Sequence, residues 1–374
     1  MRYCKKCVQP DTRPGIVFDS EGVCMACHTA ADQNIDWAAR EGELRDIAGW
    51  AKEQGAQWDC AIGVSGGKDS TFQALYARDR LGLRALLVNC TPDPITEVGV
   101  ANRENLYHLG FDMIQIRPNP LVLRTLVRRA FEDYGNLVKP TEYPLFASTW
   151  QVAARWQIPL VIQGENPAET LGIGGGLSVG GDALDIRHHN TIAGGARGLV
   201  GNGVTMRDLA FYEIPPAEEI ERAGIRSVWL GHYAMEWSRT LNTTFSVARG
   251  LRGRPMHNPA HAGRLSEYGS VDSDFQIVNQ MLKYYKFGFG FVTDEVCYSI
   301  REGTMTRDEA IELVRRYDGR CDAVYVLQFC DYIGYTLPRF WSVVDRWVNK
   351  SLFERVPHVW VPRFTIGEDF DERG

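Results

Sequence analysis

Short apolar runs alternate with helical segments through the first two-thirds of the chain, and this alternation is the strongest constraint on its fold. The runs have the length of buried strands, and the segments between them have helical apolar spacing. The expected strands cover residues 58–64, 84–89, 112–116 and 160–162. The expected helices cover residues 37–54, 71–81, 96–109, 121–134 and 145–156. Repeated β-α units of this kind predict an α/β fold with a doubly wound parallel sheet and right-handed crossovers.

The 374 residues are long enough for more than one hydrophobic core. We expect a zinc ribbon over residues 1–32, the α/β domain over 33–240 and a mostly helical region over 241–374. A glycine-dense segment, residues 172–203, follows an expected strand and is interpreted as a lid. In the last region, Thr306 and Glu309 form a capping-box pattern and Asp318-Gly319 marks the helix end. The alternation of phenylalanine and glycine over residues 287–291 is interpreted as a packed extended segment.

Four cysteines lie close together at the N-terminus as two Cys-x-x-Cys pairs, with sixteen residues between the pairs. Each pair directs two thiolates at one tetrahedral metal ion, and the turns between the pairs suit a two-knuckle ribbon. Four thiolates fill the coordination sphere and leave no position for a substrate. The pattern therefore predicts structural Zn²⁺ bound by Cys4, Cys7, Cys24 and Cys27.

The sharpest chemical motif follows the first expected strand and reads Ser65-Gly66-Gly67-Lys68-Asp69-Ser70. Glycines there let the backbone approach a ligand, while the N–H groups and dipole of the next helix favour an anion. The motif has neither Walker A nor dinucleotide-binding spacing. It resembles the SGGxDS loop of the ATP pyrophosphatase group, known as the PP-loop or adenine nucleotide α-hydrolase fold. Members of that group grip the β,γ-pyrophosphate of ATP and expose its α-phosphorus.

The resemblance implies roles for the residues of this loop. Ser65, Ser70 and the amides of Gly66 and Gly67 would donate hydrogen bonds to phosphate. Lys68 would neutralise charge on the pyrophosphate, and Asp69 would hold Mg²⁺. At the end of a later strand, Glu165 and Asn166 are candidates to orient substrate or magnesium, although an ordinary exposed loop explains them as well.

The composition argues against several classes of protein. With 41 Lys+Arg against 47 Asp+Glu, the net charge is -6, so there is no overall attraction to nucleic acid or anionic lipid. No apolar run approaches the roughly 18–20 residues of a membrane span, and the N-terminus lacks the pattern of a signal peptide. We therefore expect a cytoplasmic protein that binds neither membrane nor nucleic acid.

Several motifs together resemble one family, the N-acetyl sugar amidotransferases of bacterial surface-polysaccharide synthesis. The resemblance spans nearly the whole chain, and its N-terminal block is the most specific part. It rests on residues 3–15, the Cys24/Cys27 pair, residues 65–70, residues 164–166, residues 286–290 and residues 301–310.

The family resemblance implies a reaction and a partner. An acetamido group of a free or nucleotide-linked sugar would be adenylated by ATP and its oxygen replaced by ammonia, giving an acetamidino group, AMP and pyrophosphate. UDP-2,3-diacetamido-mannuronic acid is the best single substrate expectation. Ammonia would come from a separate glutaminase, resembling the glutaminase-cyclase pair of histidine biosynthesis. Candidate contacts for a sugar carboxylate or diphosphate, each of which a surface charge explains better, are Arg13, Lys139, His232, Arg239 and Arg249.

Two other functions remain open from the sequence. A tRNA thiolase or related tRNA-modifying PP-loop enzyme would need a reactive cysteine near the ATP site, and Cys90 is the candidate whose position fits. A docking protein with a degenerate ATP site would bind ATP without turnover, and the intact Lys68 and Asp69 argue against it.

Overall fold

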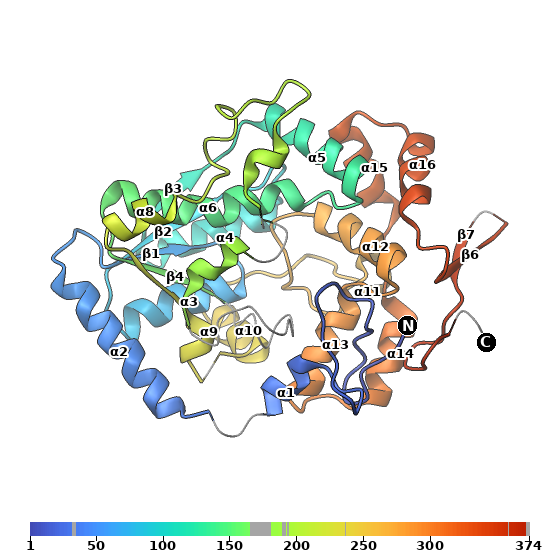
Figure 1. Cartoon of the computed structure of the whole chain (residues 1–374), viewed down its shortest axis with the longest axis horizontal. Coiled ribbons are helices and arrows are strands. Elements are labelled where there is room, and N and C mark those ends of the chain that lie inside the picture. Colours follow the sequence, from blue (N-terminus) through green and yellow to red (C-terminus); the bar gives the residue numbers. More distant parts are fainter. Residues whose placement is uncertain are drawn as a thin grey trace.

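A computed structural model provides the structure of the chain. It describes residues 1–31, 35–164, 181–188, 192, 194–235, 237–357 and 359–371. Figure 1 shows a parallel sheet with its helices on one side of the molecule and a group of helices, which contacts the N-terminal segment, on the other.

Five parallel strands form the central sheet in the order β3-β2-β1-β4-β5. Their bounds are β1 Cys60–Gly63, β2 Ala85–Cys90, β3 Asp112–Ile116, β4 Leu160–Gln163 and β5 Arg226–Trp229. The chain moves outward from β1 through β2 to β3, and then returns to place β4 on the other side of β1. This confirms the predicted doubly wound α/β fold, and it makes the carboxyl end of β1 a topological switch point.

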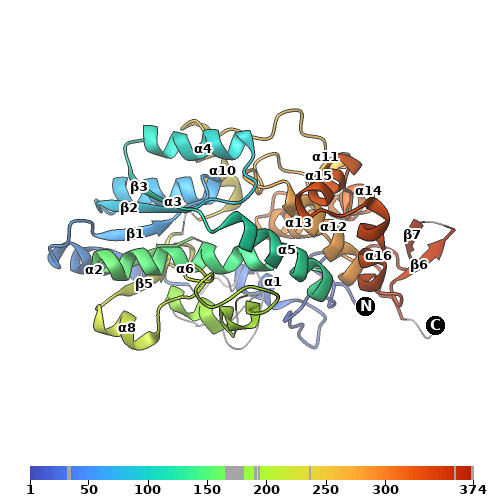
Figure 2. The ribbon, with the colours of Figure 1, turned by 90° about the horizontal axis from the view of Figure 1, so that it is seen from above.

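Alternate residues of the strands build two cores, one on each face of the sheet. Cys60 and Ile62 belong to a core shared with α2 (Trp37–Glu53), α3 (Lys68–Asp79) and α4 (Glu97–His108). Ala61 belongs to the opposite core, which is shared with α6 (Lys139–Trp156) and α8 (Ala217–Arg222). Figure 2 shows α3 and α4 on one side of the sheet and α6 on the other. Both faces are covered, as a parallel sheet requires.

The observed helices match the expected ones closely, except at the beginning of α6. That helix begins at Lys139, six residues before the expected position, and contains Pro144. Pro144 lies in the second turn, so its missing N–H removes only one hydrogen bond near the beginning of the helix. The predicted beginning of this helix is therefore six residues too late.

The C-terminal region is a group of helices followed by a two-stranded hairpin. It contains α11 (Pro259–Ala262), α12 (Phe275–Phe287), α13 (Phe291–Arg301), α14 (Arg307–Tyr317), α15 (Ala323–Ile333), α16 (Leu337–Trp347), β6 (Phe353–Val356) and β7 (Val359–Pro362). The capping box of Thr306 and Glu309 is formed at the beginning of α14, as predicted.

The prediction of an extended segment over residues 287–291 is wrong. Phe287 ends α12, Gly288 follows in the left-handed conformation with φ of 77°, and Gly290 is the N-cap of α13. A Cβ at Gly290 would lie 2.6 Å from a carboxylate oxygen of Asp318. The glycines are thus needed to turn one helix directly into the next.

The N-terminal segment shares its core with this C-terminal region. Its four clustered cysteines lie in one buried cluster with residues of α5 (Pro120–Tyr134), α12, α13, α14, α15 and α16. Both chain ends meet there, since the Met1 amino group donates to the Phe370 carbonyl at 2.7 Å and the Tyr3 amide to Asp369 at 2.9 Å. Arg307 of α14 donates to the Cys7 carbonyl at 3.1 Å.

Part of the glycine-dense segment is described, and that part has a buried core of its own. The 3-10 helices Ala183–His188 and Ala196–Leu199 place Ile186 and Leu199 against Tyr143 of α6 and Trp229 of β5. The rest of the expected lid, residues 172–180, 189–191 and 193, lies outside the described residues. Across the described ranges, no helix has the length and apolar character that a bilayer span requires.

Candidate functional site

The motif predicted to bind phosphate lies at the switch point of the sheet. Gly66 has φ of 85°, and a Cβ there would lie 2.9 Å from the backbone nitrogen of Arg103 on α4. Only glycine fits this position, because the backbone is left-handed and packed against a helix. Gly67 is the N-cap of α3, so the first N–H groups of α3 face the loop. This is the strand, glycine turn and helix arrangement that binds anions.

The two serines of the motif stabilise the loop itself. The amide of Gly67 donates to the Ser65 hydroxyl oxygen at 3.2 Å, and the Ser70 hydroxyl donates to the Gly67 carbonyl at 3.1 Å. From the sequence, both hydroxyls were expected to donate to phosphate. Ser65 uses one lone pair here, so its O–H stays able to donate to a ligand.

Lys68 and Asp69 form an ion pair at the first turn of α3. The Lys68 side chain is buried, and its ammonium donates to one carboxylate oxygen of Asp69. Burial alone would raise the pKa of Asp69, but the charge of Lys68 and hydrogen bonds from Lys68 and Asn242 outweigh burial and lower it. Asp69 is therefore an ionised carboxylate beside the phosphate loop, as a magnesium ligand must be.

A helix that sequence reasoning did not include holds this pair in place. α10 (Arg239–Val247) packs along α3. Its Asn242 donates to the second carboxylate oxygen of Asp69 at 2.9 Å, and its Ser246 hydroxyl donates to the Lys68 carbonyl at 2.8 Å. Both side chains are buried. Their i, i+4 spacing indicates that the two side chains share one face of a helix. Nothing in the sequence indicates that this face contacts the loop of residues 65–70.

The beginning of α10 is attached to the C-terminal region. The backbone N–H of Arg239 donates to Glu302 at 3.0 Å, and the Thr240 hydroxyl donates to the other oxygen of Glu302 at 2.7 Å. Glu302 directly follows α13. The phosphate loop, α10 and the C-terminal helices are thus joined by a continuous series of hydrogen bonds.

At the end of β4, the structure describes Gln163 and Gly164 but not Glu165 or Asn166, which lie outside the described residues. Gln163 is buried, and no described group forms a hydrogen bond with its Nε2. A Cβ added to Gly63 would lie 3.4 Å from Gln163 Oε1. Gln163 therefore sits beside the end of β1, and its amide is available to a ligand at the switch point.

One of the five basic residues considered as sugar contacts lies near this site. Arg239 acts electrostatically on Asp69 and stacks on Tyr298 at 4.5 Å. Arg13 is neither a surface charge nor a free cation, because it forms a buried ion pair with Asp294 at 2.5 Å. The remaining three contact other partners: Lys139 stacks on Tyr143, Arg249 stacks on Phe245, and His232 is close to Arg40.

Cys90, the thiol that a thiolase would need, lies at the end of β2 in an environment that disfavours reactivity. Burial, with a smaller contribution from Asp272, raises the pKa of the Cys90 thiol to about 12. A sulfur nucleophile needs the opposite shift, because the thiolate is the reactive form. The structure therefore weighs against the thiolase alternative.

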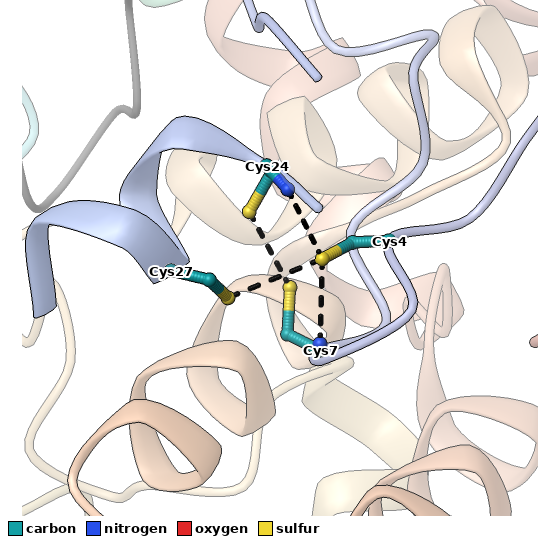
Figure 3. A group of neighbouring side chains, drawn as sticks. All are labelled: Cys4, Cys7, Cys24 and Cys27. Carbon is teal, nitrogen blue, oxygen red and sulfur yellow. Dashed lines mark hydrogen bonds between the residues drawn. The ribbon is translucent and has the colours of Figure 1, made fainter. Parts of the chain in front are cut away.

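The N-terminal cysteines form the arrangement that the sequence predicts (Figure 3). All four Sγ atoms lie within 4.8 Å of one another, with Cys4 4.0 Å from Cys27 and Cys7 3.7 Å from Cys24. A tetrahedral zinc ion with Zn–S bonds of about 2.3 Å requires sulfur atoms roughly 3.8 Å apart. The amides of Cys7 and Cys24 donate to Cys4 Sγ at 3.5 and 3.3 Å, which stabilises thiolate. The four side chains fit Zn²⁺ and leave no coordination position for a substrate.

Comparisons with known proteins give one match in the C-terminal region. Residues 262–364 match the family model described as "LPS biosynthesis protein WbpG-like, C-terminal domain". This confirms, over that segment, the resemblance to proteins of surface-polysaccharide synthesis. A comparison with curated proteins found no match.

Solved structures give more distant likenesses. NMN synthetase from Francisella tularensis is 14% identical, covers 60% of this chain and 100% of that chain, and has a TM-score of 0.29. NAD+ synthetase from Burkholderia pseudomallei is 18% identical, covers 60% of this chain and 93% of that chain, and has a TM-score of 0.27.

Proposed function

From the similarity of residues 262–364 to a WbpG-like domain of lipopolysaccharide biosynthesis and the geometry of the phosphate loop, we propose an ATP-dependent sugar amidotransferase. The enzyme would adenylate the acetamido group of an N-acetyl sugar and replace its oxygen with ammonia. The observation that carries the proposal is the Ser65–Ser70 loop at the switch point, with Lys68 and Asp69 held by α10.

The loop suits attack at the α-phosphorus of ATP. The N–H groups at the beginning of α3 and the ammonium of Lys68 would bind the β- and γ-phosphates. The carboxylate of Asp69 would hold Mg²⁺, which neutralises charge on the departing pyrophosphate. Asn242 keeps that carboxylate oriented, because it occupies one of its oxygens.

The proposed chemistry balances in two steps. The amide oxygen attacks the α-phosphorus, an O–P bond forms, and the bond to pyrophosphate breaks. Ammonia then attacks the activated carbon, AMP leaves with the original amide oxygen, and loss of a proton gives the amidine. Water would regenerate the amide at this stage, so the site has to exclude water while ammonia enters.

We also propose that a separate glutaminase supplies the ammonia. A glutaminase needs an activated thiolate, whereas burial raises the pKa of the thiols of Cys60, Cys90, Cys321 and Cys330. The family resemblance implies the same division of labour. We also propose that the protein is cytoplasmic.

The decisive experiment uses an acetamido sugar labelled with ¹⁸O in the amide carbonyl. The purified chain receives ATP, Mg²⁺, ammonium chloride and a panel of N-acetyl sugars and nucleotide sugars that includes UDP-2,3-diacetamido-mannuronic acid. We expect AMP that carries one ¹⁸O and a sugar in which NH has replaced O. Unlabelled AMP, or AMP formed only with tRNA and a sulfur donor, would refute the proposal.

A further inference from the structure

The helix that orients Asp69, α10, runs in the same direction as α3. Asn242 of α10 contacts Asp69 in the first turn of α3. Beyond the other end of α10, the Arg249 carbonyl accepts a hydrogen bond at 2.9 Å from Asn105, which lies near the end of α4. Because α3 and α4 each follow a strand, both begin at the carboxyl edge of the sheet. α10 therefore also begins at that edge, where the phosphate loop lies.

Arg239, the first residue of α10, is positioned in front of the first turn of α3. It precedes Asn242 by three residues, which is about 4.5 Å along a helix, and shares its helix face. Burial raises the pKa of Asp69, but the charges of Lys68 and Arg239 lower it. The guanidinium of Arg239 is thus within electrostatic range of the place where Lys68 and the first N–H groups of α3 would bind phosphate.

Two aromatic rings of α13 hold this guanidinium. Its central carbon lies 4.5 Å from the centre of the Tyr298 ring and 5.8 Å from that of Phe291. Both rings belong to the segment matched to the WbpG-like domain. Arg264 stacks on Phe291 and Arg301 stacks on Tyr298, each at 4.7 Å, so two further cations lie around the same rings. Stacking occupies the flat face of a guanidinium and leaves the N–H groups at its edge able to donate.

In the described part of the chain, no group accepts a hydrogen bond from the guanidinium of Arg239. The carboxylates of Asp69, Glu295 and Glu302 lie around it. Both oxygens of each carboxylate accept from other donors, which are side chains or backbone amides. Arg239 is only half-buried, and none of its side-chain nitrogen atoms is enclosed by protein. An anion from solution can therefore reach its N–H groups.

We propose that Arg239 binds the β,γ-pyrophosphate of ATP from the side of α10 and stabilises its negative charge as the bond to the α-phosphorus breaks. The edge of the guanidinium donates paired N–H groups to phosphate oxygens. Tyr298 and Phe291 are positioning residues, because they hold the guanidinium without contacting ATP. The inference rests on the proposed ATP site, to which it adds a catalytic residue. It also gives the WbpG-like segment a part in the reaction.

Ligand binding tests the inference without turnover. Isothermal titration of the full zinc-loaded chain would use ATP, inorganic pyrophosphate and AMP, each with Mg²⁺. We expect Arg239→Gln to weaken the binding of ATP and pyrophosphate by about tenfold or more, because it removes hydrogen bonds between charged groups. AMP, which lacks the pyrophosphate, should bind as before, and Arg239→Lys should recover part of the loss. Arg249→Gln is the matched control, since this arginine also stacks on a ring, that of Phe245, but lies beyond the far end of α10.

Variants of Tyr298 test the positioning role. Tyr298→Phe keeps the ring and should bind pyrophosphate as the wild type does. Tyr298→Leu removes the ring and should weaken pyrophosphate binding by about threefold, which corresponds to the loss of one cation–π contact. Zinc content and circular dichroism should stay at wild-type values in every variant.

Unchanged pyrophosphate binding in Arg239→Gln would overturn the inference. An equal loss of AMP binding would also overturn it, because Arg239 would then support only the fold of the loop. Equal losses in Tyr298→Phe and Tyr298→Leu would refute the positioning role of the ring. The proposed function is judged separately. A wild-type chain that binds neither ATP nor pyrophosphate refutes the ATP site and this inference with it, whereas binding without ¹⁸O-labelled AMP refutes the amidotransferase reaction and not the role of Arg239.

Discussion

Two parts of the molecule are stabilised in different ways. One is the central sheet with its covering helices, called the sheet region here, and the other is the cysteine-bearing segment of residues 1–31, called the ribbon region. Each face of the sheet has a core built mainly from residues between Leu44 and Ala234. The ribbon has no core of its own, and its cysteines are buried with α5 and with helices more than 240 residues later in the chain. We therefore expect a metal ion bound by these cysteines to help hold the C-terminal region, and to affect the sheet region less, through α5.

The largest expected effect follows removal of zinc. Chelation, or Cys7→Ser, should unfold the N-terminal segment together with α12 to α16, because structural zinc contributes on the order of 10 kcal/mol in small zinc domains. Limited proteolysis mapped by mass spectrometry, with circular dichroism, measures this. Cleavages should concentrate in residues 1–31 and 262–364, and the sheet region should remain protected.

Cys321→Ser provides the control, since Cys321 is partly exposed and is not in the metal cluster. It should keep one zinc ion and the normal proteolysis pattern. The comparison breaks if chelation releases only residues 1–31 and leaves the C-terminal helices protected. That result would show a ribbon that merely rests on an independently folded region.

The next effect concerns chemistry in the sheet region. Lys68→Met should reduce AMP formation by about 10³-fold, because preorganised positive charge at a transferring phosphoryl group has effects of this size. Zinc content and circular dichroism should stay at wild-type values. Lys6→Met, an exposed lysine of the ribbon, should retain full activity, and a Lys68→Met enzyme within threefold of wild type would remove this loop from the mechanism.

Asn242 tests how strongly the phosphate loop is coupled to the C-terminal region, because its helix, α10, contacts both. Asn242→Ala removes the hydrogen bond that helps to lower the pKa of Asp69, so the acid limb of the pH–rate profile should move to higher pH. More Mg²⁺ should be required, and activity should fall about 10- to 100-fold, as for other residues that orient metal ligands. Mg²⁺ titrations at several pH values provide the measurement.

A purely structural role for Asn242 would lower activity without moving the pH profile or the Mg²⁺ requirement. Asn242→Ser keeps a donor and should recover part of both. Thr243→Ala on the same helix is the control, because its hydroxyl donates only to the Arg239 carbonyl. Glu302→Gln should have a smaller effect of the same kind, since it weakens the attachment of α10 to the C-terminal region.

The features predicted from the sequence are those whose signal is local. The strands are short apolar runs because both faces of a parallel sheet are buried, and the loop of residues 65–70 carries its glycines and charges side by side. The Cys-x-x-Cys pairs likewise place metal ligands within a few residues. In each case, the residues that determine the feature lie within a few positions of one another in the sequence.

The features that were missed depend on contacts between distant residues. Asn242 and Asp69 are 173 positions apart, and Arg13 meets Asp294 across 281 positions, so neither pair leaves a pattern in the sequence. The Phe-Gly alternation failed for another reason. Glycine is compatible with both an extended strand and a left-handed helix cap, and Gly288, packed beside Leu352, adopts the second.

The smallest expected effect is on how the stability of each region depends on pH. It should differ between the sheet region and the ribbon region. Burial, with a further contribution from Arg40, lowers the pKa of His232 to about 4. The unfolded chain has a histidine pKa near 6.5, so it takes up a proton first as the pH falls. The contribution of neutral His232 to the free energy of unfolding of the sheet region should therefore be fully present above about pH 6.5. It should be lost as the pH falls toward 4. We expect a loss of about 1–2 kcal/mol, because solvent screens a half-buried ring.

Urea unfolding between pH 4 and 7, followed through protection of the sheet region, measures this loss. His232→Gln should flatten the dependence, whereas His108→Gln, on an exposed face of α4, should leave it unchanged. The ribbon region has a different acid limit, because its thiolates release zinc when they are protonated, and a zinc indicator follows that release separately. The opposite result would be that the free energy of unfolding falls equally in His232→Gln and in the wild type, and in parallel with zinc release. In that case acid would act through the ribbon alone, and the two regions would unfold together.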